Sequence, residues 1–228
     1  MAIVDPRLFL PPRPADYAWD EPNYLVHFHF LPSDLHDRLL LLTHNANLAL
    51  AIGSGYWILA RLGPLDPDRE PMEFTQAVWA EMAPDYACAR HYPPDDLWRG
   101  PVRGALLTEM TILFDVLDER GNNPVIADRA VWMYNFARHV IGPMPEYHAW
   151  FEATIQRLER HHSWSAEGNP QARLFDDHFP VGRPVSPEVL DPEFPYDPAQ
   201  APDLLDRHIN RLLRNGNPFV LDADEHDH

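Results

Sequence analysis

Apolar and small residues recur at spacings of three and four over residues 33–62, which is the periodicity of one helix face. The repeating positions are Leu35, Leu39, Leu42, Ala46, Ala49, Gly53, Tyr56 and Ala60. Gly63-Pro64 then stops the helix, because proline cannot continue the hydrogen-bond ladder. Over 48–60 nearly every face is apolar or small, so neighbouring elements must cover this segment all round. The pattern predicts one continuous central helix of an all-α domain.

The same periodicity predicts five further helices, giving about six in all. They cover residues 72–88, 101–120, 125–140, 146–162 and 203–214. Short connections between the third, fourth and fifth helices of the chain indicate antiparallel neighbours. The run 24–30, YLVHFHF, is the one segment that alternates as a strand does, and no second strand to pair with it is evident.

The chain is expected to form a single domain over 1–228. An extended arm rich in proline and aromatic residues, 1–32, precedes a helical core over 33–162. A proline-rich strap, a terminal helix and an acidic tail follow, over 163–202, 203–215 and 216–228. Because the strap contains aromatic residues that disordered linkers lack, we expect 173–202 to be ordered against the bundle.

Composition restricts the compartment and the partners. The formal net charge is −17, from 35 acidic residues and 18 arginines, with no lysine. This charge argues against binding nucleic acid or an anionic membrane through a basic face, and it permits attraction to a basic protein. Plain solubility is the alternative explanation. The N-terminus lacks a signal-peptide pattern, the apolar run 48–60 is too short to span a bilayer, and Cys88 stands alone, so we expect a soluble cytoplasmic protein.

Thirteen histidines raise the question of a metal site. His27 and His29 lie on one side of an extended segment, and Glu159-x-x-His162 has the spacing of di-iron ligands in helical bundles. A di-iron site needs a second such motif on a helix, and the other Glu-x-x-His is in the acidic tail. A chain without lysine also cannot hold a standard Walker motif. We therefore expect no metal, no cofactor and no catalytic residues, with a His/carboxylate metal-dependent enzyme as the alternative.

The segment 95–103, DDLWRGPVR, is the most suggestive stretch outside the expected core. It places acids, a tryptophan and two arginines around the start of a helix, and Trp and Arg dominate binding hot spots. We predict that a partner binds Asp95, Asp96, Trp98, Arg99 and Arg103. The alternative is that the tryptophan packs against the bundle while the arginines pair with nearby carboxylates.

The run NLALAIGSGYWILARL, a Trp-bearing second helix and DDLWRGPVRGALL together resemble immunity proteins encoded beside bacterial polymorphic toxins. The resemblance covers roughly residues 47–162. It implies an acidic, non-enzymatic helical protein that neutralises a cognate toxin domain by occluding its active face. We expect that toxin to carry a basic face, as a nuclease does. A structural or regulatory adaptor is a third reading.

Overall fold

The computed structural model describes residues 15–21, 23–90, 93–94, 96–119, 123–164 and 180–223. These residues form seven α-helices: α1 (Ser33–Leu39), α2 (His44–Leu62), α3 (Glu70–Ala77), α4 (Gly100–Asp118), α5 (Asn123–Ile141), α6 (Pro145–His162) and α7 (Ala201–Arg214). Four short 3-10 helices connect them: η2 (Tyr24–His27), η3 (Gly63–Leu65), η4 (Val78–Met82) and η6 (Pro187–Leu190). Two short strands, β1 (Tyr86–Cys88) and β2 (Val220–Asp222), pair antiparallel. The prediction of an all-α domain is confirmed.

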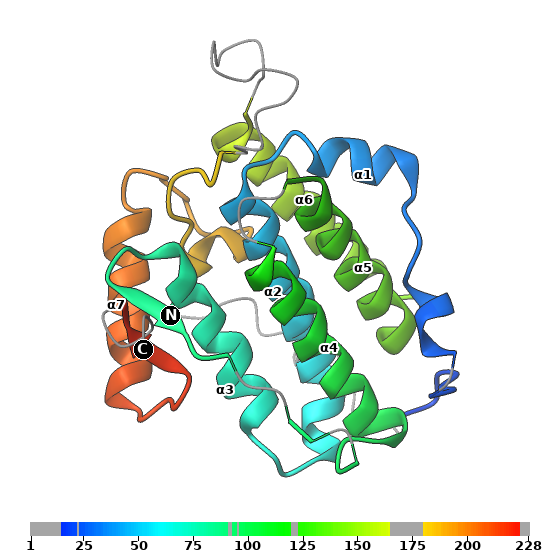
Figure 1. The fold of residues 1–228 in the computed structure, drawn as a ribbon. Helices are drawn as coiled ribbons and strands as arrows, with labels where there is room; N and C mark the ends of the chain where they lie inside the picture. Colours follow the sequence, from blue (N-terminus) through cyan, green and yellow to red (C-terminus); the bar gives the residue numbers. More distant parts are fainter. Residues whose placement is uncertain are drawn as a thin grey trace.

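Helix α2 forms the centre of the bundle (Figure 1). All 19 of its residues are buried. Helices α3, α4, α5 and α6 contact it, and η6 of the strap closes the remaining side. Within the described residues it is also the one helix that could cross a membrane by length and composition, but 83% of its most apolar window is buried inside the protein.

Two glycines on α2 allow neighbouring elements to come close. A Cβ at Gly53 would lie 2.8 Å from Leu190 Cδ2 of η6 and 2.8 Å from Trp150 Cη2 of α6. A Cβ at Gly55 would collide with the carboxyl group of Glu109 on α4. The strap, α6 and α4 can therefore approach the central helix only because these side chains are missing.

The prediction of one helix over 33–62 is wrong, because the chain breaks between α1 and α2. Thr43 has an extended conformation, with φ −66° and ψ 163°. Its amide donates to the carbonyl of His162 at 3.0 Å, and the amide of Trp164 donates to the carbonyl of Leu41 at 3.0 Å. The backbone between the two helices is therefore paired with the end of α6 and does not continue a helical ladder.

Distant groups complete the two helix ends at this break. The Asn47 side-chain amide donates to the carbonyl of Leu39 at 3.1 Å, which satisfies an acceptor at the end of α1. The first amides of α2, those of His44 and Asn45, donate to strap carbonyls at residues 180–181 over 3.2 and 3.0 Å. The break is thus stabilised by tertiary contacts that no local pattern contains.

The prediction of a helix over 72–88 is wrong beyond Ala77. Helix α3 passes into η4, and the chain then continues into β1. In the pairing of β1 with β2, Ala87 lies opposite Leu221. Because this partner strand comes from the far end of the sequence, periodicity within 72–88 could not reveal it.

The arm does not contain the strand-like run predicted over 24–30. The first four of these residues form η2, and Phe28 is the one buried side chain of the run. Asn135 on α5 fixes the arm, because its side-chain amide donates to the carbonyls of Phe28 and Phe30 at 3.2 and 2.9 Å. The alternation of residue types therefore does not mark two faces of a sheet.

One buried arginine holds the strap against the bundle. Arg157 on α6 is 8% exposed. Its guanidinium donates hydrogen bonds to the strap carbonyls of Glu188, Val189, Asp191, Pro192 and Phe194. The strap is accordingly ordered over 180–202, as predicted, while residues 173–179 of that prediction and the acidic tail from 224 onward lie outside the described residues.

We predict that Gly53→Ala destabilises the protein by roughly 1–3 kcal/mol, because the added methyl group overpacks α2 against Trp150 and Leu190. Gly63→Ala is the matched control, since no atom lies within 4 Å of its Cβ position and its φ is −54°. This control is expected to change stability little or to raise it by about 0.4–1 kcal/mol. Urea denaturation measures both, and equal effects would contradict the packing argument.

We also predict that Arg157→Met loosens the strap, because several buried carbonyls lose a charged donor, at a cost of at least about 2 kcal/mol. Limited proteolysis should then cut within 180–202 faster than in the native chain. Arg160→Met removes an exposed arginine from the same helix and serves as the control. Unchanged protection in Arg157→Met would show that apolar contacts alone retain the strap.

Candidate functional site

The predicted interaction loop belongs partly to the core. Trp98 is 5% exposed and packs in the main hydrophobic cluster. Arg103 donates to Asp66 through Nε at 2.6 Å and Nη2 at 3.1 Å, and its guanidinium lies 5.4 Å from the centre of the Trp98 ring. This is the alternative arrangement of the sequence analysis, in which the tryptophan packs inward and an arginine pairs with a carboxylate.

Asp96 and Arg99 are the predicted loop residues that stay exposed, and Asp95 lies outside the described residues. Arg99 comes directly before the first turn of α4. Partner binding at this loop stays a prediction. Of the five residues predicted to bind the partner, Asp96 and Arg99 are the described ones whose side chains are exposed. Truncating Trp98 would remove a core side chain, so its effect would fall on stability.

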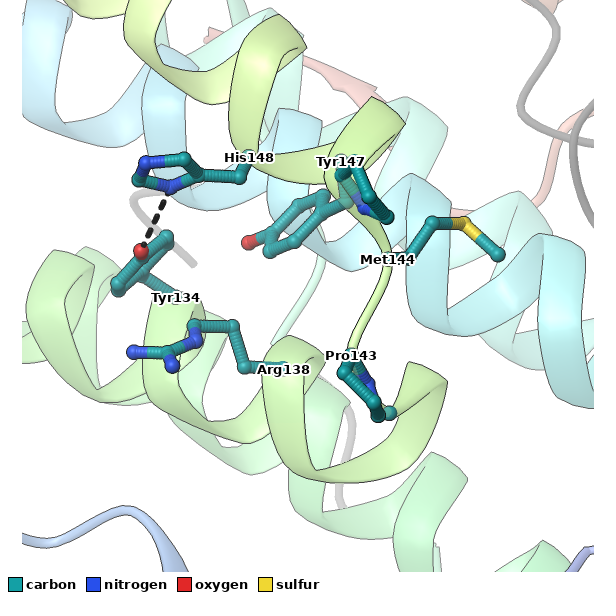
Figure 2. A pocket seen from close by; sticks show the side chains of 8 residues that line it. Tyr134, Arg138, Pro143, Met144, Tyr147 and His148 are labelled. Carbon is teal, nitrogen blue, oxygen red and sulfur yellow. Dashed lines mark hydrogen bonds between the residues drawn. The ribbon is translucent and has the colours of Figure 1, made fainter.

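A half-open pocket of about 360 Å³ lies at the turn between α5 and α6 (Figure 2). Its walls include Tyr134, Arg138, Pro143, Met144, Tyr147 and His148. The Tyr134 hydroxyl lies 3.4 Å from His148 Nδ1, whereas the Tyr147 hydroxyl donates inward to Ser54 at 3.0 Å. Sequence analysis missed this site, because its residues are typical of a helix end and converge only when α5 and α6 fold back on each other.

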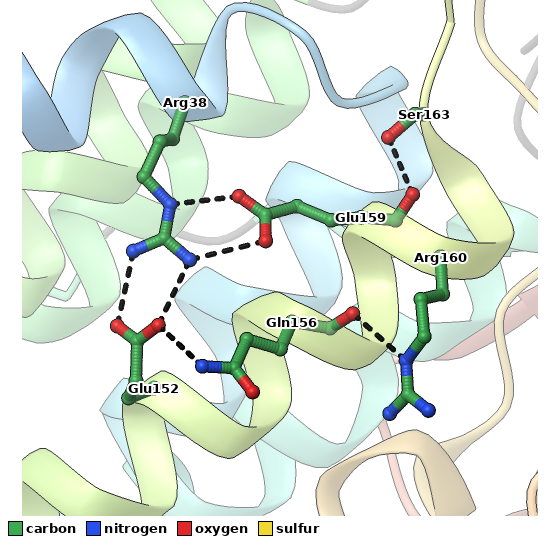
Figure 3. A network of polar contacts seen from close by, with 6 residues as sticks. All are labelled: Arg38, Glu152, Gln156, Glu159, Arg160 and Ser163. Carbon is green, nitrogen blue, oxygen red and sulfur yellow. Dashed lines mark hydrogen bonds and ion pairs between the residues drawn. The ribbon is translucent and has the colours of Figure 1, made fainter.

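The Glu-x-x-His motif on α6 does not form a ligand pair. Arg38 of α1 donates to Glu159 at 2.7 Å and to Glu152 at 3.0 Å, which ties α1 to α6 (Figure 3). His162 is engaged elsewhere, since its Nε2 lies 2.9 Å from the Tyr196 hydroxyl of the strap. The two members of the motif therefore serve two different structural contacts.

The two arm histidines also separate. The ring of His27 stacks on His139 with 4.1 Å between centroids, and that of His29 lies 3.9 Å from the Trp132 centroid. No group of three or more His, Cys, Asp or Glu side chains that could hold a metal occurs in the described part of the chain.

Glu109 places an ionisable group in the centre of the protein. It is fully buried, and its Oε1 lies 3.0 Å from the Thr75 hydroxyl, which also lies 2.8 Å from the carbonyl of Pro71. The hydroxyl has one proton, so when Thr75 donates it to the carbonyl, a protonated Glu109 can donate to Thr75 in turn. Burial raises the pKa of Glu109 to about 8. Such a group suits proton transfer, but at zero exposure it is a structural acid in this conformation.

The arm exposes a cluster of apolar side chains, here called the arm surface: Leu25, Val26, Phe30 and Leu31. They are 42–70% exposed and make up four of the nine exposed large apolar residues in the described chain. The described end of the arm, from residue 23 to residue 32, runs along the outside of the bundle beside α5 before the chain enters α1 (Figure 1). Exposed apolar clusters with polar borders are typical of interaction sites.

Acidic residues border the arm surface. Residues 15–37 contain five acids and no arginine. Asp20 comes before the apolar cluster, and Asp34 and Asp37 follow it on α1, where both are exposed. Arg38 does not offset them, because it is bound to two carboxylates of its own. A partner that covers this surface must supply apolar side chains together with positive charge.

No protein-family model matches the chain, and no match is found among curated proteins or solved structures. The arm surface and the pocket are therefore the features of the described chain that bear on function.

We predict that Glu109 makes stability fall with rising pH. Its pKa of about 8 in the folded state exceeds its ordinary value of 4.5, so the folded state retains a proton that the unfolded chain loses. The stabilisation is complete below 4.5 and is lost as the pH rises through about 8, at up to about 1.4 kcal/mol per pH unit in between.

The measurement is urea denaturation at several pH values for the native chain and for Glu109→Gln, which stays neutral at nearly the same size. As the pH rises toward about 8, the unfolding free energy of the native chain is expected to fall relative to that of Glu109→Gln. A difference that does not depend on pH would show that Glu109 titrates normally.

Proposed function

We propose that the chain is a non-enzymatic acidic binding protein of the immunity type. It binds a cognate toxin domain and neutralises it by covering a basic active face, such as that of a nuclease. We further propose that it acts in the bacterial cytoplasm. The observation that carries the proposal is the arm surface, where exposed apolar residues are bordered by acids.

The charge supports the same class of partner. A net charge of −17 attracts a basic protein over distances near the Debye length and raises the association rate. Residues 63–104, which include the predicted loop, add eight acids against four arginines. The acidic excess of the sequence is therefore not confined to the arm, whereas four of the nine exposed large apolar side chains in the described chain belong to the arm surface.

Acidic charge and exposed apolar side chains are expected to affect different steps of binding. Charges at the border of an interface act mainly on the association rate, and well-packed apolar anchors act mainly on dissociation. Of the four residues of the arm surface, Phe30 is the one with an aromatic side chain, and Val26 is 70% exposed. These two are the proposed apolar anchors.

We predict that the protein binds the product of an adjacent reading frame and protects cells that express it. Association should slow as salt rises. Asp34→Arg with Asp37→Arg should slow association by roughly tenfold. The matched control is Asp203→Arg with Asp206→Arg on α7, which makes the same charge change at exposed positions away from the arm.

Val26→Ser with Phe30→Ser should speed dissociation, whereas Met72→Ser with Leu213→Ser, at exposed apolar positions elsewhere, should not. Surface-immobilised binding kinetics at several salt concentrations measure all four variants. No binding and no protection would overturn the immunity function. If binding were unaffected by salt and by the arm variants but weakened by substitution of Asp96 or Arg99, the interface would lie at the predicted loop instead.

A further inference from the structure

We infer that the pocket between α5 and α6 binds a small carboxylate that carries an aromatic or short aliphatic body (Figure 2). The inference is independent of toxin binding, because it concerns a different surface and a different class of ligand.

In the described chain, Arg103, Arg129 and Arg138 lie over aromatic rings. Arg103 lies over Trp98 and also binds Asp66 at 2.6 Å. Arg129 lies 4.0 Å from the centre of the Trp132 ring and also binds Asp115 at 3.2 Å. In both arrangements the ring orients the guanidinium, and a carboxylate completes it.

Arg138 has the ring without the carboxylate. Its guanidinium lies 5.5 Å from the centre of the Tyr134 ring. Among the described residues, no acidic side chain pairs with it. The guanidinium fork matches a carboxylate geometrically and binds it with charge-assisted hydrogen bonds. Arg138 is therefore an oriented cation at the pocket wall, and the ligand's carboxylate supplies the missing partner.

His148 helps to position the aromatic ring that Arg138 lies over. Its Nδ1 lies 3.4 Å from the Tyr134 hydroxyl, while its Nε2 is on the side of the imidazole away from Arg138 (Figure 2). The first turn of α6 adds to the attraction for a carboxylate, because Met144 at its N-cap makes no side-chain hydrogen bond to the turn and the helix dipole favours an anion there.

The rest of the pocket fits an apolar body of limited size. Pro143, Met144 and the ring of Tyr147 form its other walls. A volume of about 360 Å³ is near the lower end for ligand pockets. Glu146, exposed in the same turn, opposes a multiply charged anion such as a phosphate. A monocarboxylate with one ring or a short chain satisfies all of these features.

The test uses the full chain and 3-phenylpropionate, with 3-phenylpropanamide as its neutral counterpart, in calorimetric or NMR titrations. The carboxylate should bind saturably, and the amide at least about tenfold more weakly, because it lacks the charge that Arg138 recognises. Arg138→Gln should weaken carboxylate binding by a similar factor. Arg160→Gln removes an exposed arginine from α6 and should leave carboxylate binding unchanged.

Arg138 is exposed, so its replacement leaves the core intact, which a thermal melt verifies. A further titration uses N-acetylphenylalanine. Stronger binding of this ligand than of 3-phenylpropionate would identify a peptide C-terminus as the source of the carboxylate. Equal binding of acid and amide, equal binding by Arg138→Gln, or no saturable binding by the native chain would each overturn the inference.

Discussion

The complete burial of α2 is the constraint on which the structure depends. Over residues 48–60 this helix is apolar or small on nearly every face, so one layer cannot cover it and the chain must surround it. Helices α3, α4, α5 and α6 cover most of its circumference, and the proline-rich strap covers the rest. The strap is therefore part of the core, and the carbonyls that its irregular backbone exposes are satisfied by Arg157.

Polar groups around α2 follow from the same constraint. The Tyr147 hydroxyl donates to Ser54, and the indole of Trp79 donates to the Tyr56 hydroxyl, each at 3.0 Å. Buried polar atoms need such partners, and these pairs fix how α6 and η4 meet the central helix. Glu109 is the costly member of this set, and its protonation relieves the charge that burial penalises.

Both proposed binding regions depend on α5, which packs closely on α2 and turns its other side outward. Asn135 on this helix holds the arm backbone, so that the arm surface is presented on a fixed support. Arg138, one turn later, lines the pocket at the junction with α6. A buried scaffold thus supports two proposed binding regions of different chemistry, an acid-bordered apolar surface and a pocket lined by one arginine.

The fold class could be predicted from the sequence, as could helices α4, α5, α6 and α7 to within about two residues, because helical periodicity and Pro or Gly stop signals are local. For the DDLWRG loop we predicted partner binding and kept a packed tryptophan as the alternative, and the structure shows Trp98 packed in the core.

Features that depend on contacts between distant segments could not be predicted from the sequence, because no local pattern contains those contacts. The break before Thr43 requires the end of α6, β1 requires β2, and the burial of Trp98 requires the assembled bundle. The arm surface and the pocket belong to the same group. Their residues are ordinary in sequence, and we propose them as sites because packing leaves some apolar side chains exposed and leaves Arg138 over the Tyr134 ring without an acidic partner among the described residues.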